Sequence, residues 1–206
     1  MSRRPCAASP AAGNVSDVDI RAAQPADAQA IAQVRIDSWR TTYRGLIPDA
    51  YLDGMTVEAS TALWQRVLQA ESAAASVFVA VRDGEVVGFA AGNALKEPKH
   101  GADAELTAVY LRRDAQRMGV GHRLVGAVVA AEQARGASAI IVWTIAGNRG
   151  ARTFYESLGG ELVVEQPFVW DGMDLVEAGY VWRDLPALAA ACAQVPSIVP
   201  SPSHLH

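Results

Sequence analysis

The sequence predicts a single α/β domain in which a mixed β-sheet is flanked by helices. Short apolar runs of strand length alternate along most of the chain with longer segments whose apolar residues recur at helical spacing. Two Asp-Gly pairs, at residues 83–84 and 171–172, stand between apolar runs and are typical of two-residue hairpin turns. The chain has 206 residues, and half of them are hydrophobic, which is enough for one domain with a substantial core.

In the first half of the chain, an expected short strand at residues 19–21 leads into a helix that begins near Pro25. Proline suits the first turn of a helix because its φ is already close to the helical value. A second helical region spans residues 48–70 and is interrupted near Gly54. The strands expected at residues 76–81 and 85–91 form a hairpin, and the polar residues 96–103 are expected to form a loop.

In the second half, a strand is expected at residues 104–111, and a long helix at residues 119–135 ends at Gly136. A strand at residues 140–143 and a helix at residues 148–158 follow. Short strands near residues 162–164 and 179–182 complete the sheet. Residues 17–185 therefore form the expected domain. It lies between a flexible leader at residues 1–16 and a flexible C-terminal tail at residues 186–206, which holds a short helix at most.

Composition and charge argue against several classes of protein. The net charge is -4, whereas a general nucleic-acid-binding domain is usually basic. No apolar run is long enough to span a membrane, and none follows the basic residues 1–5 as in a secretory signal. The two cysteines, Cys6 and Cys192, lie in the expected tails, so we expect a cytoplasmic protein without disulfides. His204 and His206 lie in the tail without further ligands nearby, and we expect no metal site.

The segment from Gln116 to His122, which we call the glycine loop, carries the clearest chemical signal. It lies between an apolar strand and an apolar helix, and it contains Gly119 and Gly121. Glycines let the backbone approach a ligand closely, and the N–H groups at a helix N-terminus attract anions such as a pyrophosphate. Arginines at positions 112, 113, 117 and 123 surround the loop and would complement phosphates. A glycine-rich turn that merely starts a helix is the alternative interpretation.

The context of the glycine loop favours ligand binding, because three separated motifs resemble those of the GNAT acetyltransferase family in the expected order. Gln116-x-x-Gly119-x-Gly121 is similar to the family's coenzyme A loop. Residues 105–111 look like its acetyl-CoA-lining strand, and residues 147–160 resemble its last helix. The resemblance covers residues 18–185. It implies a GNAT fold, in which a mostly antiparallel sheet splays open between two central parallel strands and acetyl-CoA enters the gap as cosubstrate.

The resemblance also implies a contact for each part of acetyl-CoA. Main-chain groups of Val109 and Leu111, with Tyr110 between them, would line and pair with the pantetheine arm, and Asn148 would hydrogen-bond it. The pyrophosphate would be held by backbone N–H groups of the glycine loop, which consists of Gln116, Arg117, Met118, Gly119, Val120, Gly121 and His122. We expect the His122 side chain to lie at the start of a helix near phosphate rather than to act in catalysis.

The implied reaction is direct attack of a neutral amine on the thioester carbonyl. A base must take the amine's proton, directly or through water, and an acid can protonate the departing thiolate. Tyr155 lies where many family members place a tyrosine near the sulfur and is the acid candidate, with a core aromatic as the alternative. Glu105 begins the acetyl-CoA strand and is the base candidate. The alternative is that Glu105 is an ordinary exposed glutamate at the end of a strand. In that case water or another carboxylate could serve as base. The backbone N–H of Val109 is the candidate donor to the oxyanion.

Residues 38–49 read Ser-Trp-Arg-Thr-Thr-Tyr-Arg-Gly-Leu-Ile-Pro-Asp and resemble a subset of bacterial GNAT proteins. In the family, this region shapes the acceptor pocket. Trp39 and Tyr43 would form a wall of that pocket and bind a cation through their ring faces. Arg44 would instead grip a carboxylate. Core packing is the alternative interpretation of Trp39.

The predicted function is therefore transfer of an acetyl group to a primary amine of a small molecule, by a monomer or homodimer. Acetylation of a protein or peptide amine is the close alternative, and it would need an open groove at the acceptor site. A non-catalytic acetyl-CoA-binding module is a second alternative, and the presence of both Glu105 and Tyr155 argues against it.

Overall fold

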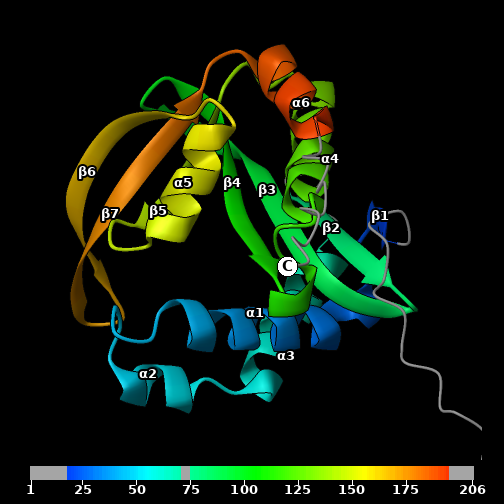
Figure 1. Cartoon of the computed structure of the whole chain (residues 1–206), viewed down its shortest axis with the longest axis vertical. Coiled ribbons are helices and arrows are strands. Elements are labelled where there is room, and N and C mark those ends of the chain that lie inside the picture. The colour runs from blue at the N-terminus through cyan, green and yellow to red at the C-terminus, as the bar shows by residue number, and fades with distance from the viewer. Residues whose placement is uncertain (1–17, 71–74, 195–206) are drawn as a thin grey trace, which may run out of the picture.

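A computed structural model describes residues 18–70 and 75–194. Within them, helices alternate with the strands of a seven-stranded sheet of order β1-β2-β3-β4-β5-β7-β6 (Figure 1). Neighbouring strands are antiparallel except β4 and β5, which are parallel. The predicted fold class, a mixed and mostly antiparallel sheet flanked by helices, is confirmed. The predicted leader lies outside the described residues.

The helices and strands occur along the chain in the predicted order. The strands are β1 (Val18–Ala22), β2 (Ala75–Arg82), β3 (Glu85–Lys99), β4 (Ala102–Leu111), β5 (Ile140–Ile145), β6 (Glu161–Trp170) and β7 (Met173–Trp182). The helices are α1 (Ala28–Thr42), α2 (Asp49–Gly54), α3 (Val57–Gln69), α4 (Val120–Ala134), α5 (Arg149–Ser157) and α6 (Leu185–Ala193), with short 3-10 turns at Pro25–Asp27 and Arg113–Ala115. The predicted interruption near Gly54 separates α2 from α3. Thr56 then caps α3, because its hydroxyl accepts a hydrogen bond from the backbone N–H of Ala59 at 3.2 Å.

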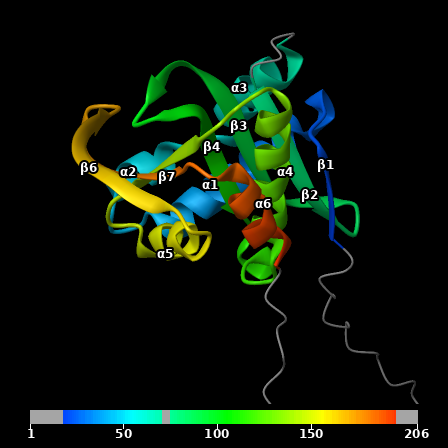
Figure 2. The same ribbon diagram turned by 90° about the horizontal axis from the view of Figure 1, so that it is seen from above.

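Helices cover the two faces of the sheet unequally. Helices α4, α5 and α6 pack on one face, and α1 and α3 pack on the other face over β2, β3 and β4 (Figures 1 and 2). Phe89 and Ala90 are neighbours on β3 and are fully buried in different clusters, as the two-residue period of a strand requires. Strands β5, β7 and β6 have one face toward α5 and one face away from it. Among the described elements, no such helical layer covers the face away from α5, so its side chains can line a site.

The parallel strands β4 and β5 separate soon after they begin to pair. Their register is limited to Ala104–Leu106 against Ile140–Val142, although both strands continue further. On the other side of β4, Ala91 pairs with Ala108 and Gly92 with Leu106, so Thr107 is an extra residue, a β-bulge. A bulge bends its strand and increases the local twist. The result is the gap between two central parallel strands that the sequence predicted.

The polar loop predicted at residues 96–103 is wrong. Strand β3 continues to Lys99, β4 begins at Ala102, and a tight turn joins them at His100 and Gly101, which have φ of 52° and 82°. Residues 96–100 are all exposed, so the apolar alternation that reveals a half-buried strand is missing there. The strand reaches the turn without buried side chains, past an irregularity in the register between Ala94 and Lys99.

The folded part of the chain also continues beyond the predicted domain end at residue 185. Leu185, Leu188 and Cys192 of α6 are buried and belong to the core cluster that includes α4. Asp184 caps α6 by accepting a hydrogen bond from the N–H of Ala187 at 2.9 Å. The predicted tail is therefore too long at its start, and residues 195–206 lie outside the described residues. Among the helices described, none is both long and apolar enough to cross a membrane.

Candidate active site

Two cavities open on the gap between β4 and β5. One, which we call the loop cavity, has a volume of about 610 Å³ and lies beside the glycine loop and α5. The other, the hairpin cavity, has a volume of about 470 Å³ and lies beside α1 and the β6–β7 hairpin. The residues that line both cavities are Tyr43, Leu106, Thr107, Tyr110, Trp143 and Thr144. The gap is therefore the place where the contents of the two cavities would meet.

The glycine loop has the backbone geometry of an anion site. Arg117 and Gly119 both have left-handed conformations, with φ of 58° and 77°, immediately before α4 begins. Successive backbone N–H groups in such a turn point into one concavity at a helix N-terminus. A side chain at Gly121 would place its Cβ 3.3 Å from Phe154 Cζ and 3.4 Å from Leu111 Cδ1, so α4 packs tightly at this glycine.

Most of the predicted cofactor residues line the loop cavity. They are Val109, Tyr110, Leu111, Gln116, Arg117, Gly119, Gly121, His122 and Asn148. Met118 and Val120 do not line it, because Val120 is fully buried in the core and Met118 packs against the same cluster. Their predicted contact was through backbone N–H groups, and that contact stays a prediction.

Asn148 and His122 are placed by the starts of α5 and α4. Asn148 caps α5, since its Oδ1 accepts a hydrogen bond from the N–H of Ala151 at 3.1 Å. Its side chain also lies close enough to the Tyr43 hydroxyl to lower the pKa of that phenol by a hydrogen bond. His122 packs edge to face on Phe154 with a ring separation of 5.3 Å. Burial lowers the pKa of His122, so its ring is neutral at neutral pH.

Three tyrosine hydroxyl groups surround the junction of the cavities. Tyr155 is 6% exposed, lines the loop cavity, and packs against Phe154 of α5 and Trp182 of β7. Burial raises the pKa of Tyr155, and the neighbouring Tyr110 raises it further. Burial likewise raises the pKa of Tyr43 and of Tyr110. All three phenols are therefore protonated at neutral pH and are suited to donate a proton or a hydrogen bond.

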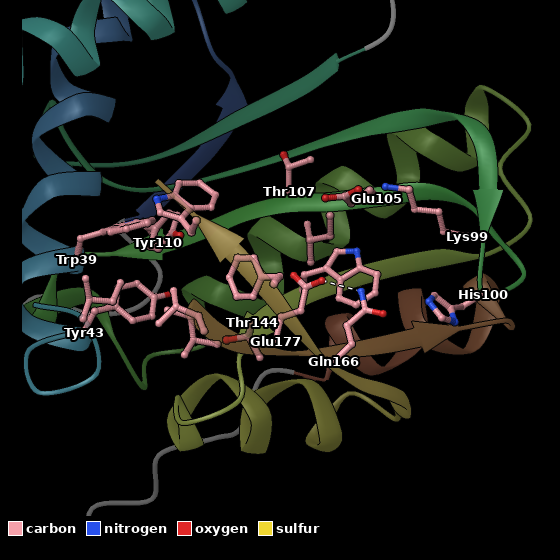
Figure 3. Close-up of a pocket in the computed structure, with 17 residues that line it drawn as sticks. Trp39, Tyr43, Lys99, His100, Glu105, Thr107, Tyr110, Thr144, Gln166 and Glu177 are labelled. Atoms are coloured by element: carbon pink, nitrogen blue, oxygen red, sulfur yellow. Dashed lines mark hydrogen bonds between the residues drawn. The ribbon is translucent and has the colours of Figure 1, made fainter. Parts of the chain in front are cut away.

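Two carboxylates enter the hairpin cavity from different strands (Figure 3). Glu105 lies on β4 opposite Ile141 of β5, and Glu177 lies on β7 opposite Ile145 of β5. Burial raises the pKa of the Glu105 carboxyl; the positive charge of Lys99 lowers it, and the negative charge of Glu177 raises it. A carboxylate of raised pKa in a partly apolar cavity can accept a proton from a bound cation.

Aromatic rings form much of the remaining wall of the hairpin cavity. The rings are those of Trp39, Tyr43, Tyr110, Trp143, Phe168 and Trp170. Trp39 of α1 lies 4.9 Å from Tyr43 and 5.8 Å from Trp170, measured between ring centroids. The Trp170 indole N–H also donates a hydrogen bond to the Tyr51 hydroxyl at 3.0 Å, which ties the β6–β7 hairpin to α2.

The structure places the predicted acceptor residues differently from one another. Trp39 and Tyr43 line the hairpin cavity, and their predicted contact with an acceptor stays a prediction. Arg44 lines neither cavity, because its guanidinium pairs with Asp49 at 3.2 Å and Asp53 at 2.9 Å on the surface of α2. These two aspartates are four residues apart and so lie on the same side of the helix.

Sequence reasoning missed the contributions of two hairpins. Lys99 and His100 come from the β3–β4 turn that was expected to be a loop, and Gln166 and Glu177 come from the β6–β7 hairpin. One signal was available. A two-residue turn at residues 171–172 fixes the register of the strands it joins, and that register places residue 166 opposite residue 177. Within the described chain, no three His, Cys, Asp or Glu side chains are grouped to hold a metal ion.

The chain is similar to known proteins in sequence and in fold. The sequence model of the Acetyltransferase (GNAT) family matches residues 36–160. The uncharacterised N-acetyltransferase YuaI of Bacillus subtilis is 36% identical over 173 residues, which are 83% of this chain and 96% of YuaI. The crystal structure of PaiA N-acetyltransferase from Thermoplasma acidophilum in complex with coenzyme A has a TM-score of 0.62 at 19% identity, and covers 78% of this chain and 97% of its own. YncA from Salmonella typhimurium with acetyl-CoA has a TM-score of 0.60 at 18% identity, over 81% and 93% of the two chains.

Together the fold, the family match and the named relatives define an acetyl-CoA-dependent acyltransferase. The chain belongs to the GNAT acetyltransferase family.

Proposed function

We propose that the protein transfers the acetyl group of acetyl-CoA to an amine of a small molecule by direct attack. The observation that carries this proposal is the junction of the two cavities at the gap between β4 and β5. A thioester that reaches the gap from the loop cavity would meet an amine held in the hairpin cavity. The protein thereby brings the two reactants together in one orientation, which is a large part of the catalytic effect in such reactions.

The loop cavity fits acetyl-CoA in both backbone and charge. Backbone N–H groups of the glycine loop would hold the pyrophosphate, and the Arg117 side chain on the cavity wall would complement its charge. Main-chain groups of Val109 and Leu111, on the unpaired part of β4 that faces the gap, would take the pantetheine arm. The Asn148 amide nitrogen would add a hydrogen bond to the same arm.

The chemical step uses one carboxylate and one phenol. Glu105 accepts a proton from the ammonium form of the acceptor, directly or through a water molecule, and leaves a neutral amine. The amine nitrogen forms a bond to the carbonyl carbon, the bond from that carbon to sulfur breaks, and the electron pair leaves with the sulfur. Tyr155 gives its proton to the thiolate, and the proton that the acylated nitrogen must lose to become a neutral amide returns through solvent to the Tyr155 phenolate. The backbone N–H of Val109 serves as the donor to the oxyanion.

The size and borders of the hairpin cavity support a small acceptor. The β6–β7 hairpin closes one side, and the hydrogen bond between Trp170 and Tyr51 joins it to α2. A volume of about 470 Å³ suits a free amine of modest size.

The thiol of Cys192 is free and buried, which suits a reducing compartment such as the cytoplasm.

Release of free coenzyme A tests the proposal. Purified protein is incubated with acetyl-CoA and, in separate samples, with simple amines, amino acids, polyamines and aminoglycosides, and the free thiol is measured against a sample without amine. We expect amine-dependent release, with the acetylated product identified by mass spectrometry. Release only with peptides would indicate a protein acetyltransferase, and acetyl-CoA binding without release for any amine or peptide would indicate a binding module.

A further inference from the structure

Glu177 is an acidic side chain without a cationic partner in the hairpin cavity. It is half-buried, and it takes part in none of the ion pairs formed among residues 18–70 and 75–194. Other glutamates of the neighbouring strand β6 are paired, Glu165 with Arg152 at 2.7 Å and Glu161 with Arg183. A partly desolvated carboxylate gains from a cation that replaces its lost water. The feature that would satisfy Glu177 is therefore a positive charge on a ligand.

The Glu177 carboxylate is held in a fixed direction by its neighbour across the hairpin. Gln166 stands opposite Glu177 in the register, and its Nε2 donates a hydrogen bond to Glu177 Oε1 at 2.8 Å (Figure 3). An amide orients a carboxylate without neutralising its charge. The second oxygen of Glu177 remains available, and the rings of Phe168 and Trp170 on the same hairpin offer faces that attract cations.

The backbone positions of Glu105 and Glu177 lie toward different ends of the hairpin cavity, while their carboxylates remain close enough for the charge of Glu177 to raise the pKa of Glu105. Their partners on β5, Ile141 and Ile145, are four residues apart, which is about 13 Å along a strand. Lys99 acts on Glu105, and Figure 3 shows Lys99 beside Glu105 and Gln166 beside Glu177. The positive charge contributed by the protein is therefore concentrated at the Glu105 end, while the Glu177 end is negative and aromatic.

We propose that Glu177, oriented by Gln166, determines acceptor specificity by binding a second cationic group, so that the acceptor is a small dication whose other amine is acetylated. This inference rests on the proposed function. In it, Glu105 serves the reacting amine and Glu177 holds the ammonium at the far end of the same molecule. Acceptors that lack the second charge lose the contact with Glu177 but retain the reaction.

A matched series of acceptors tests this assignment with the full-length protein and saturating acetyl-CoA. The probes are hexylamine, hexamethylenediamine and aminohexanoic acid, which share a six-carbon chain and differ only at the far end. We expect kcat/KM to be about tenfold or more higher for the diamine than for the monoamine, the usual strength of a hydrogen bond to a charged group. Glu177→Gln is expected to raise KM for the diamine about tenfold and to leave KM for hexylamine unchanged. The comparison is made above the acid limb of the kcat/KM profile, because the charge of Glu177 also raises the pKa of Glu105.

Three further variants separate specificity from a general structural role. Glu177→Asp retains the charge and is expected to restore part of the preference for the diamine. Gln166→Leu removes the orienting amide and is expected to raise KM for the diamine only. Asp174→Asn removes the same charge from an exposed position on the same strand and is expected to change nothing.

The possible outcomes distinguish this inference from the proposed function. Equal kcat/KM for the diamine and hexylamine, a preference for aminohexanoic acid, or an unchanged KM in Glu177→Gln would each overturn the inference while leaving acetyl transfer in place. Calorimetric titration of the diamine in the presence of coenzyme A measures binding without turnover. Binding that Glu177→Gln weakens about tenfold would support the role of Glu177 even if no amine were acetylated, in which case the proposed function fails instead.

Discussion

Replacing Tyr155 with Phe removes a single hydroxyl from the wall of the loop cavity. The ring keeps its packing against Phe154 and Trp182, and none of the hydrogen bonds found within the described chain involves its hydroxyl. The free energy of unfolding should therefore change by less than about 1 kcal/mol. If this hydroxyl protonates the leaving thiolate, turnover should fall about a hundredfold, or about 2.7 kcal/mol in activation free energy.

Tyr180 provides a matched control, because the same substitution there has the opposite balance of effects. Its hydroxyl accepts a hydrogen bond from Arg152 Nε at 2.9 Å and donates one to Glu156 Oε1 at 2.7 Å. Both partners are charged, so Tyr180→Phe should lower the free energy of unfolding by about 2–4 kcal/mol. Tyr180 lines neither cavity, and the folded fraction of this variant should retain turnover within about threefold of wild type.

Urea denaturation and single-turnover kinetics measure the two quantities independently. Denaturation gives the free energy of unfolding of each variant by linear extrapolation. A single turnover of bound acetyl-CoA isolates the chemical step from product release. A wild-type single-turnover rate in Tyr155→Phe would refute the proton-donor argument and return this residue to the core. Equal rate losses in both variants would show that disturbed packing, rather than proton delivery, is responsible.

Three other substitutions probe the base, its charge environment and the anion site. Glu105→Gln should slow turnover about a hundredfold for an acceptor of high pKa and less for a weakly basic one, with acetyl-CoA affinity by calorimetry unchanged; equal effects confined to KM would indicate charge attraction instead. Lys99 lowers the pKa of Glu105, so Lys99→Gln should raise that pKa. Because the base acts deprotonated, the acid limb of the kcat/KM profile against pH should then move to higher pH. A limb that moves to lower pH would contradict this. Gly119→Asp should abolish acetyl-CoA binding, because it adds a negative charge and a side chain where φ is 77°; a folded variant with unchanged affinity would remove the glycine loop from the site.

The features that the sequence predicted well are those encoded by neighbouring residues. The glycine loop, the start of α4 and the Asp171–Gly172 turn each depend on a few consecutive residues whose backbone preferences are strong. The family motifs then located the loop cavity. Strand pairing between exposed polar segments has no such local signal, so the extension of β3 to Lys99 was missed, and with it one charged group of the hairpin cavity.

The hairpin cavity was predicted less completely because it is assembled by strand register. Glu177 and Gln166 are eleven residues apart in sequence and meet only when the β6–β7 hairpin closes. Arg44, a predicted acceptor residue, lies outside the hairpin cavity for a related reason. Its pairing with Asp49 and Asp53 depends on how α2 turns after Pro48, which motif similarity does not report. Motifs of consecutive residues could be predicted from the sequence. Which residues of different helices and strands contact one another could be seen only in the fold.

The separation of the two cavities has a consequence for how enzymes of this kind diversify. Of the described residues, none on β6 or β7 lines the loop cavity, whereas five of them line the hairpin cavity. Under the proposed function, substitutions at these five positions are expected to exchange one acceptor for another without disturbing how acetyl-CoA is held. Buried residues of the same hairpin, such as Tyr180 and Trp182, belong to the core. The five cavity-lining positions are therefore the ones to randomise when a new acceptor is wanted, rather than the whole hairpin.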